Sequence, residues 1–188
     1  KSIVESCDTY YYLLARDMGV DLIHDEMARL GLGQFTGIDI LGEARGILPS
    51  TEWKRKTYKK ADQQRWYSGE TISLGIGQGY NSYTMLQMAQ ATATLVNDGV
   101  QMRPHLVREV TDPVTSARQV IAKEPVAQMP FKPEHMAIIR QAMVDVNLYG
   151  TSASSFAGAS YTSGGKTGTA QVYTVGQNEK YQASRVNE

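Results

Sequence analysis

The stretch that most constrains this chain is GGKTGTA, residues 164–170. Its β-branched residues favour an extended strand, because branched side chains pack well on a pleated surface. Gly165 and Gly168 lack the Cβ atoms that would hold a second backbone at a distance. Lys166 adds a compact positive charge between them. We therefore expect a strand whose edge holds a carboxylate beside a carbonyl group under attack, although a Lys-Thr-Gly triplet alone also occurs in ordinary turns.

The charge balance of the chain excludes several classes of function. Its 188 residues are enough for one domain with a sizeable core. They hold 19 Lys and Arg against 19 Asp and Glu, so the formal net charge is zero. A nucleic-acid-binding surface needs a basic excess, so no nucleic-acid partner is expected. No apolar run approaches the roughly 20 residues that a transmembrane helix needs.

The cysteine and histidine content argues against a metal site. Cys7 is the single cysteine, which excludes a disulfide within the chain. The three histidines, His24, His105 and His135, are scattered without the spacing of metal ligands. We therefore expect neither a metal nor a cofactor.

The first thirty residues have the apolar spacing of two helices. Ser6 or Asp8 has the residue type of an N-cap for a helix over residues 9–17, and Gly19 has that of its C-terminal cap. A second helix is predicted over residues 21–30. From these residues alone, capping is the ordinary interpretation of Ser6 and Asp8.

Residues 34–79 have the composition of mostly irregular chain, and residues 54–60 carry five Lys or Arg. Such a charge run is typical of a solvated loop, and a docking surface for a partner or an acidic polymer is the alternative. Residues 75–79, GIGQG, lack the spacing and the βαβ context of a phosphate-binding loop. We interpret them as a close-packed turn before a helix.

The second half of the chain alternates between helical and extended patterns. A helix is predicted over residues 82–97, with an inward side formed by Met85, Met88, Ala89, Thr92, Leu95 and Val96. An edge strand interrupted by Pro104 follows over residues 100–110, and residues 111–131 form a turn and a short returning strand. Pro133 begins a helix that ends near Gly150. Its predicted buried side consists of Met136, Ile138, Ile139 and Met143.

Two short elements 160 residues apart form a set. Ser6-x-Asp8 and Lys166-Thr167-Gly168 match, in order, the second and third motifs of the serine acyltransferases that bind penicillin, Ser-x-Asn and Lys-Thr/Ser-Gly. The matching strings are Ser6-Cys7-Asp8-Thr9-Tyr10, Gly37-Ile38-Asp39, Gly75-Ile76-Gly77-Gln78-Gly79-Tyr80 and Gly165-Lys166-Thr167-Gly168-Thr169-Ala170-Gln171-Val172. Together they make the chain resemble penicillin-binding protein 2, the class B peptidoglycan D,D-transpeptidases of cell elongation.

The resemblance implies an α/β (α+β) fold of the penicillin-binding transpeptidase and serine β-lactamase type, with a mainly antiparallel sheet flanked by helices. The only Ser-x-x-Lys in the chain runs from Ser163 to Lys166 and overlaps the third motif, and one lysine cannot serve both motifs. We therefore expect residues 1–188 to be a partial transpeptidase domain that lacks the upstream Ser-x-x-Lys segment and the last strands and helix. The polar residues 174–188 are expected to form an exposed loop.

The resemblance also implies catalytic roles. A serine outside this chain would attack the penultimate D-Ala carbonyl of a stem peptide, and a second peptide would take the acyl group. Ser6 would relay a proton between the lysine partner of that external serine and the leaving or entering nitrogen. Asp8, where most members of the wider family carry Asn, would orient and hold the network around that lysine partner. Lys166 would keep Ser6 in place and attract anionic substrate. The backbone N–H of Thr169 would be one of two oxyanion donors.

Substrate binding is implied for three further residues. Thr167 would hydrogen-bond the terminal carboxylate, which penicillins also present. Gly168 would leave room for the acyl group, and Gly165 and Gly168 would let the substrate backbone approach closely. The implied ligands and partners are peptidoglycan stem peptides, β-lactams, a RodA-like membrane glycan polymerase and other elongation proteins. A single-pass anchor outside this chain would hold the enzyme in the inner membrane, with the catalytic domain in the periplasm.

Two other functions share this fold. A serine β-lactamase would use the same strand, but it would need a base that activates water, and no residue marks one clearly. A non-catalytic β-lactam sensor would stay acylated, and persistent penicillin binding without cross-linking would favour it.

Overall fold

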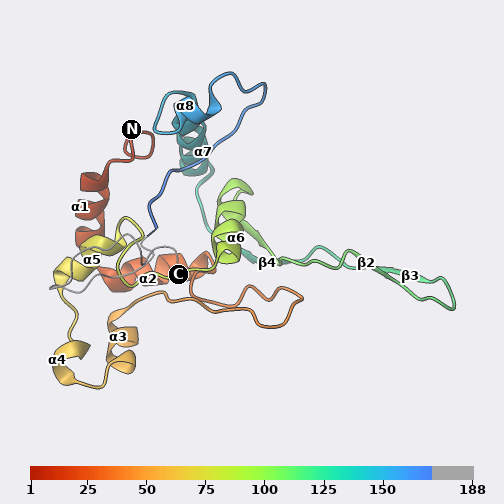
Figure 1. Cartoon of the computed structure of the whole chain (residues 1–188), viewed down its shortest axis with the longest axis horizontal. Helices are drawn as coiled ribbons and strands as arrows, with labels where there is room; N and C mark the ends of the chain where they lie inside the picture. Colours follow the sequence, from red (N-terminus) through yellow and green to blue (C-terminus); the bar gives the residue numbers. More distant parts are fainter. Residues whose placement is uncertain (171–188) are drawn as a thin grey trace, which may run out of the picture.

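The computed structural model describes residues 1–170, and Gln171, Val172 and the polar stretch 174–188 lie outside the described residues. Helices and two antiparallel strand pairs form a mixed α/β architecture (Figure 1). The helices are α1 (Asp8–Met18), α2 (Val20–Arg29), α3 (Thr51–Thr57), α4 (Ala61–Gln64), α5 (Ser68–Leu74), α6 (Met85–Val96), α7 (Pro133–Leu148) and α8 (Ala153–Phe156). Within residues 1–170, none of these helices combines the length and the apolar character that crossing a membrane requires.

The two N-terminal helices confirm the predicted spacing but not the predicted cap. Cys7 is the N-cap of α1, and no side chain caps the helix. The expectation that Ser6 or Asp8 caps it is therefore wrong, because Asp8 already lies inside the first turn. Gly19 ends α1 with φ 75° and its N–H donates to Ala15 O, which turns the chain into α2.

The segment predicted to be irregular instead contains α3, α4 and α5. Its first helix begins where the Ser50 hydroxyl accepts a hydrogen bond from the N–H of Trp53 at 2.9 Å. The expected solvated loop over residues 54–60 is wrong at its first residue, since only 3% of Lys54 is exposed. Sequence composition predicts solvation for a lysine, and tertiary contacts override it here.

Lys54 lies in a box of aromatic side chains. Its ammonium donates to Glu70 Oε1 and, at 2.8 Å, to the carbonyl of Arg65. It also lies over three rings, 5.4, 5.4 and 5.5 Å from the centroids of Trp66, Tyr67 and Tyr80. A buried charge needs such partners, because desolvation costs several kcal/mol otherwise. The box ties α3 to α5 and to Tyr80.

The next helix, α6, buries a different face from the predicted one. Thr84 and Gln87 form a capping box at its start. Met85 is 83% exposed, whereas Gln87 is completely buried, so the prediction of an inward methionine face is wrong. The Gln87 amide donates to the carbonyls of Gln34 and Arg45. The buried amide is favoured here because it donates hydrogen bonds to two carbonyls in loops, outside the regular hydrogen bonding of helices and sheets.

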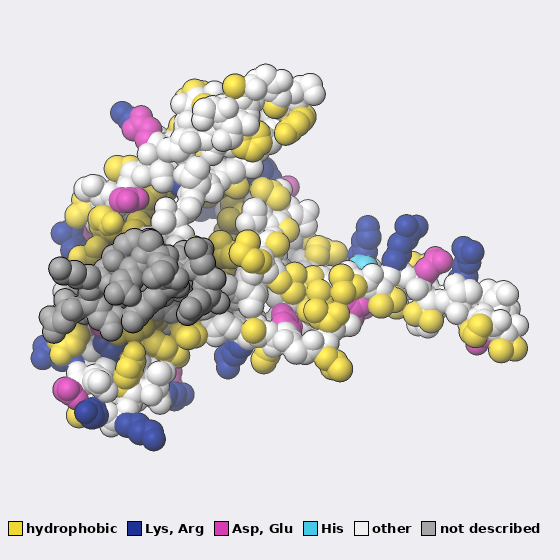
Figure 2. Space-filling model, viewed as in Figure 1, with side chains coloured by type: hydrophobic (Ala, Val, Ile, Leu, Met, Phe, Trp, Pro, Cys, Tyr) yellow, Lys and Arg dark blue, Asp and Glu magenta, His cyan; other side chains and the backbone are white. Residues whose placement is uncertain are grey.

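Two short antiparallel pairs follow, formed by β1 (Val100–Met102), β2 (Glu109–Thr111), β3 (Arg118–Val120) and β4 (Pro125–Gln128). Strand β1 pairs with β4 in a register that places Val100 opposite Gln128, and β2 pairs with β3. The single strand predicted over residues 100–110 is therefore split in two. Figure 1 shows that β2 and β3 project from the body as an arm, and Figure 2 shows basic side chains along it. Its exposed apolar residues include Leu106, Val110, Val114 and Val120.

Helix α7 begins with Pro133 in its first turn and ends at Leu148 with Tyr149 as its C-cap, close to the predicted end. Met136 is buried, but Ile138 is 67% exposed, so the predicted buried side is wrong at that position. Beyond its end, Gly150 lies against residue Val4: a Cβ atom added to the glycine would meet Val4 O at 2.5 Å. This close approach brings the N-terminal residues onto the end of α7.

Residues 164–170 do not form the predicted strand in the described part of the chain. In Figure 1 they run as a blue trace from α7 toward α1 and α5. The N–H of Gly165 donates to Met143 O at 3.0 Å, and the Asn147 amide donates to Ser163 Oγ at 2.9 Å. Helix α7, rather than a neighbouring strand, therefore holds the start of this segment.

Candidate active site

The two motifs that lie 160 residues apart in the sequence meet in space. The Lys166 ammonium donates a hydrogen bond to Ser6 Oγ at 2.7 Å. It also donates to the carbonyl of Thr167 at 2.8 Å. Lys166 is exposed and Ser6 is half-buried, so among the described residues the pair lies outside the core. This hydrogen bond joins the two sequence motifs into one candidate site.

Ser6 adopts an unusual backbone conformation with φ 51°. Non-glycine residues rarely occupy this left-handed region, and the strain costs about 1–3 kcal/mol. A tight turn imposes it, in which Cys7 N donates to Ser2 O at 3.0 Å and Ser6 N to Ile3 O. The strained turn presents the Ser6 hydroxyl to Lys166, and such strain clusters at functional sites.

Asp8 acts on Lys166 through its charge. Partial desolvation by neighbouring groups lowers the pKa of the Lys166 ammonium, and the negative charge of Asp8 raises it. Desolvation is the larger effect, so the pKa lies below its usual value although the side chain as a whole is exposed. The neutral amine is therefore more accessible than in an ordinary exposed lysine, while Asp8 limits that change.

The threonine and the glycines beside Lys166 have different surroundings. Thr167 Oγ1 lies 2.9 Å from the hydroxyl of Thr151, which precedes α8. Among residues 1–170, a Cβ atom added to Gly168 would meet nothing within 4 Å, whereas one added to Gly165 would lie 3.4 Å from Asn147 Oδ1. Within this part of the chain, Gly168 has free space beside it, and Gly165 faces α7.

A cavity of about 570 Å³ adjoins these groups. Its lining includes six of the residues singled out from the sequence, Ser6, Asp8, Lys166, Thr167, Gly168 and Thr169. Gly165 is the one that does not line it. A cavity with several convergent polar groups is typical of a ligand site.

Two residues, one that lines the cavity and one that lies beside Gly165, were not assigned a role from the sequence. Gln78 lines the cavity and donates through Nε2 to the carbonyl of Thr169 at 3.3 Å. Asn147 is 5% exposed, and its Oδ1 has no hydrogen-bond partner among residues 1–170. The GIGQG string marked the position of Gln78 in the sequence, whereas no sequence pattern marked Asn147.

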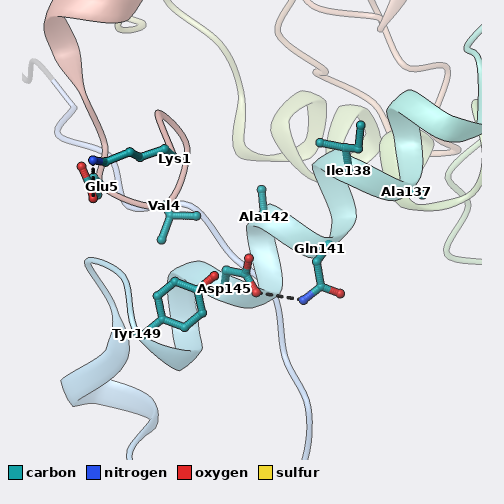
Figure 3. Close-up of a pocket in the computed structure, with 9 residues that line it drawn as sticks. All are labelled: Lys1, Val4, Glu5, Ala137, Ile138, Gln141, Ala142, Asp145 and Tyr149. Carbon is teal, nitrogen blue, oxygen red and sulfur yellow. Dashed lines mark hydrogen bonds and ion pairs between the residues drawn. The ribbon is translucent and has the colours of Figure 1, made fainter.

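A second cavity, of about 590 Å³, lies between the N-terminal residues and α7 (Figure 3). Its polar groups pair locally: Gln141 donates to Asp145 at 2.8 Å, and Lys1 lies 3.8 Å from Glu5. The remaining lining is largely apolar, with Val4, Ala137, Ile138 and Ala142. The polar groups do not converge on a common point, unlike those around Lys166. In the described part of the chain, no group of three His, Cys, Asp or Glu could hold a metal ion.

Comparison with known proteins gives a consistent result. The family model described as penicillin binding protein transpeptidase domain matches residues 1–187. The peptidoglycan D,D-transpeptidase MrdA of Escherichia coli is 38% identical over 193 residues, which cover 100% of this chain and 29% of that protein. The chain therefore spans less than a third of this relative.

Solved structures agree with the family match. PBP2 of Pseudomonas aeruginosa, in complex with WCK 5153, is 39% identical with a TM-score of 0.77, over 91% of this chain and 38% of the other. A structure of a peptidoglycan synthase complex that coordinates polymerization and crosslinking is 30% identical, with a TM-score of 0.75. The match covers 90% of this chain and 27% of the other. These likenesses confirm the fold and the resemblance inferred from the motifs. The chain belongs to the penicillin-binding protein transpeptidase domain family.

Proposed function

We propose that this chain is part of a peptidoglycan D,D-transpeptidase that cross-links stem peptides through a serine acyl-enzyme and is a target of β-lactams. The observation that carries the proposal is the 2.7 Å contact between Lys166 Nζ and Ser6 Oγ at the edge of a cavity. The names of the MrdA relative and of the transpeptidase family support it. Residues 1–188 are then a partial transpeptidase domain, and a segment outside this chain supplies the attacking serine.

The proposed reaction assigns a task to each polar group. The external serine attacks the penultimate D-Ala carbonyl, D-Ala leaves, and the amine of a second peptide takes the acyl group. Ser6 passes the proton that the attacking serine loses to the departing nitrogen. It later passes the proton of the entering amine back to the serine oxygen as the ester bond breaks. Lys166 positions Ser6 through their hydrogen bond, and Asp8 sets how readily Lys166 loses its proton.

The substrate carboxylate and the oxyanion occupy neighbouring positions in this proposal. Thr167 binds the terminal carboxylate, with Thr151 fixing its hydroxyl. The N–H of Thr169 donates to the oxyanion, and within residues 1–170 no acceptor takes that N–H. Gly168 leaves space for the acyl group, because no atom of the described residues lies within 4 Å of the position that a Cβ would take. Gly165 serves the site indirectly, by allowing the segment to pack on α7.

The cellular setting is also part of the proposal. The full protein acts in cell elongation and rod-shape maintenance, anchored in the inner membrane by a single span outside this chain, with this domain in the periplasm. A RodA-like glycan polymerase is its proposed membrane partner. The related peptidoglycan synthase complex, which coordinates polymerization and crosslinking, supports that pairing.

Fluorescent-penicillin labelling of the full-length protein tests the site. We expect stable labelling of the wild type, strong loss in Ser6→Ala and Lys166→Ala, and wild-type labelling in the exposed control variant Ser154→Ala. Equal labelling of all four proteins would place the acyl-transfer site elsewhere. A parallel assay of D-Ala release on cross-linking separates the alternatives: persistent labelling without cross-linking identifies a sensor, and rapid loss of the label identifies a β-lactamase.

A further inference from the structure

The turn over residues 75–79 is held by close packing and by backbone hydrogen bonds. Gly75 packs directly on α1, since an added Cβ would lie 2.5 Å from Tyr11 O and 2.7 Å from the Cβ of Ala15. Within the turn, Gln78 N donates to Ser73 O at 3.1 Å, and Gly77 N donates to Leu74 O at 2.9 Å. The turn is therefore fixed to the helix that follows Ser6.

The C-terminal end of the turn is fixed to the aromatic box. The Tyr80 hydroxyl donates to Glu70 Oε1 at 3.0 Å, and Glu70 is the partner of buried Lys54. The Tyr80 ring also packs on Trp53, with the centroids 5.2 Å apart. With both ends held, Gln78 extends toward the cavity from a rigid base.

Gln78 bridges this base and the segment around Lys166. Its Nε2 donates to the carbonyl of Thr169 at 3.3 Å, across 91 residues of sequence. The N–H and the carbonyl of Thr169 belong to peptide planes that share one Cα, and only φ and ψ of this residue separate them. A hydrogen bond that fixes the Thr169 carbonyl therefore limits how far the backbone that carries its N–H can turn.

We propose that Gln78 is a positioning residue that orients the N–H of Thr169 toward the oxyanion of the acyl-transfer reaction. This inference rests on the proposed function. Oxyanion donors lower barriers because their direction is set before charge develops, and one lost donor typically slows a reaction 100- to 1000-fold. Gln78 does not touch the oxyanion itself, so we expect a smaller effect, on the order of 10-fold, on acylation and deacylation alike.

The first test measures the acylation time course of the full-length protein with fluorescent penicillin. Gln78→Ala removes the amide, and Gln78→Glu keeps the shape but loses the donor at neutral pH. We expect both to lower the acylation and deacylation rate constants about 10-fold while the final labelled fraction stays that of the wild type. The control Gln119→Ala, on the projecting arm, should match the wild type in both respects.

The second test reads the oxyanion donor directly. Infrared spectroscopy of the acyl-enzyme formed with a carbonyl-¹³C penicillin reports how strongly the ester carbonyl is polarised. We expect its stretching frequency to rise in Gln78→Ala, because a misdirected N–H polarises the carbonyl less. A purely structural role would lower the labelled fraction and leave both the rate constants and this frequency unchanged, and that result would overturn the inference.

The two proposals fail in different ways. A wild-type protein that labels and cross-links, with Gln78 variants indistinguishable from Gln119→Ala, refutes the role of Gln78 alone. A wild-type protein that neither labels nor cross-links refutes the proposed function, and the role of Gln78 falls with it.

Discussion

Two lysines of this chain illustrate opposite uses of a positive charge. Lys54 is 3% exposed, pairs with Glu70 and is surrounded by aromatic rings. Lys166 is exposed, donates to the uncharged Ser6 hydroxyl, and meets the acidic Asp8 only as a charge that raises its pKa. Lys54 therefore has its partners inside the fold, whereas Lys166 lies beside a cavity.

The difference separates a structural lysine from a candidate catalytic one. A fully paired buried charge contributes to the fold only while its partner remains, because an uncompensated charge in the interior is costly. An exposed lysine beside a strained serine contributes little to stability and remains available for a ligand. The following predictions test that division.

The largest effect is expected from Lys54→Met, which leaves Glu70 partly buried without its cation. We expect a loss of about 3–5 kcal/mol in the free energy of unfolding. Denaturation of the full-length protein, followed through the unfolding transition of this domain, measures it. Lys56→Met is the matched control, since Lys56 is exposed and forms a surface ion pair with Glu52 one turn away, and should change stability by less than about 0.5 kcal/mol. Similar losses in both variants would contradict a special role for the aromatic box.

Lys166→Ala should show the reverse pattern. We expect the rate of penicillin labelling to fall on the order of 100-fold, because the Ser6 hydroxyl loses its donor. The unfolding transition should stay within experimental error, since the side chain is exposed. Lys123→Ala, an exposed substitution on the projecting arm, should leave both quantities unchanged. A large stability loss in Lys166→Ala would mean that the two lysines are not as different as proposed.

The acid stability of the box is expected to depend on Glu70. Burial raises the pKa of Glu70. Hydrogen bonds from Lys54, the N–H of Tyr67 and the Tyr80 hydroxyl together lower it by more, so the pKa lies below its usual value. The folded state therefore binds this proton less readily than the unfolded state. The resulting stabilisation is present above the unfolded pKa and is lost as the pH falls through the folded pKa. Thermal unfolding scans at decreasing pH should show this loss, and Glu70→Gln should reduce it.

The smallest effect is expected from Asp8→Asn. Removing the carboxylate removes the charge that raises the pKa of Lys166, so that pKa should fall further. The alkaline limb of the labelling rate against pH should then move to lower pH. Asp17→Asn, near the other end of α1, is the control and should leave the profile in place. A shift toward higher pH would mean that Asp8 does not act on Lys166 by its charge.

Local patterns predicted much of the helical structure. The limits of α1, α2 and α7 follow from apolar spacing, from Gly19 and from Pro133, all of which are local signals. The buried faces did not follow. Met85 and Ile138 are exposed and Gln87 is buried, because burial depends on which segment packs against a helix. Helical spacing can identify a face as apolar without identifying what covers it.

The sequence by itself determined the family and indicated the residues of the candidate site. The strings around Ser6, Gly75 and Lys166 are specific in their order, and no fold is needed to read them. Only the tertiary structure decided that Ser6 meets Lys166 at 2.7 Å and that Gln78 reaches Thr169. It also decided that Lys54 is a core residue, against the charge run around it. The physical reason is that hydrogen bonds and burial between distant residues depend on the packing of the whole chain, which a local pattern does not encode.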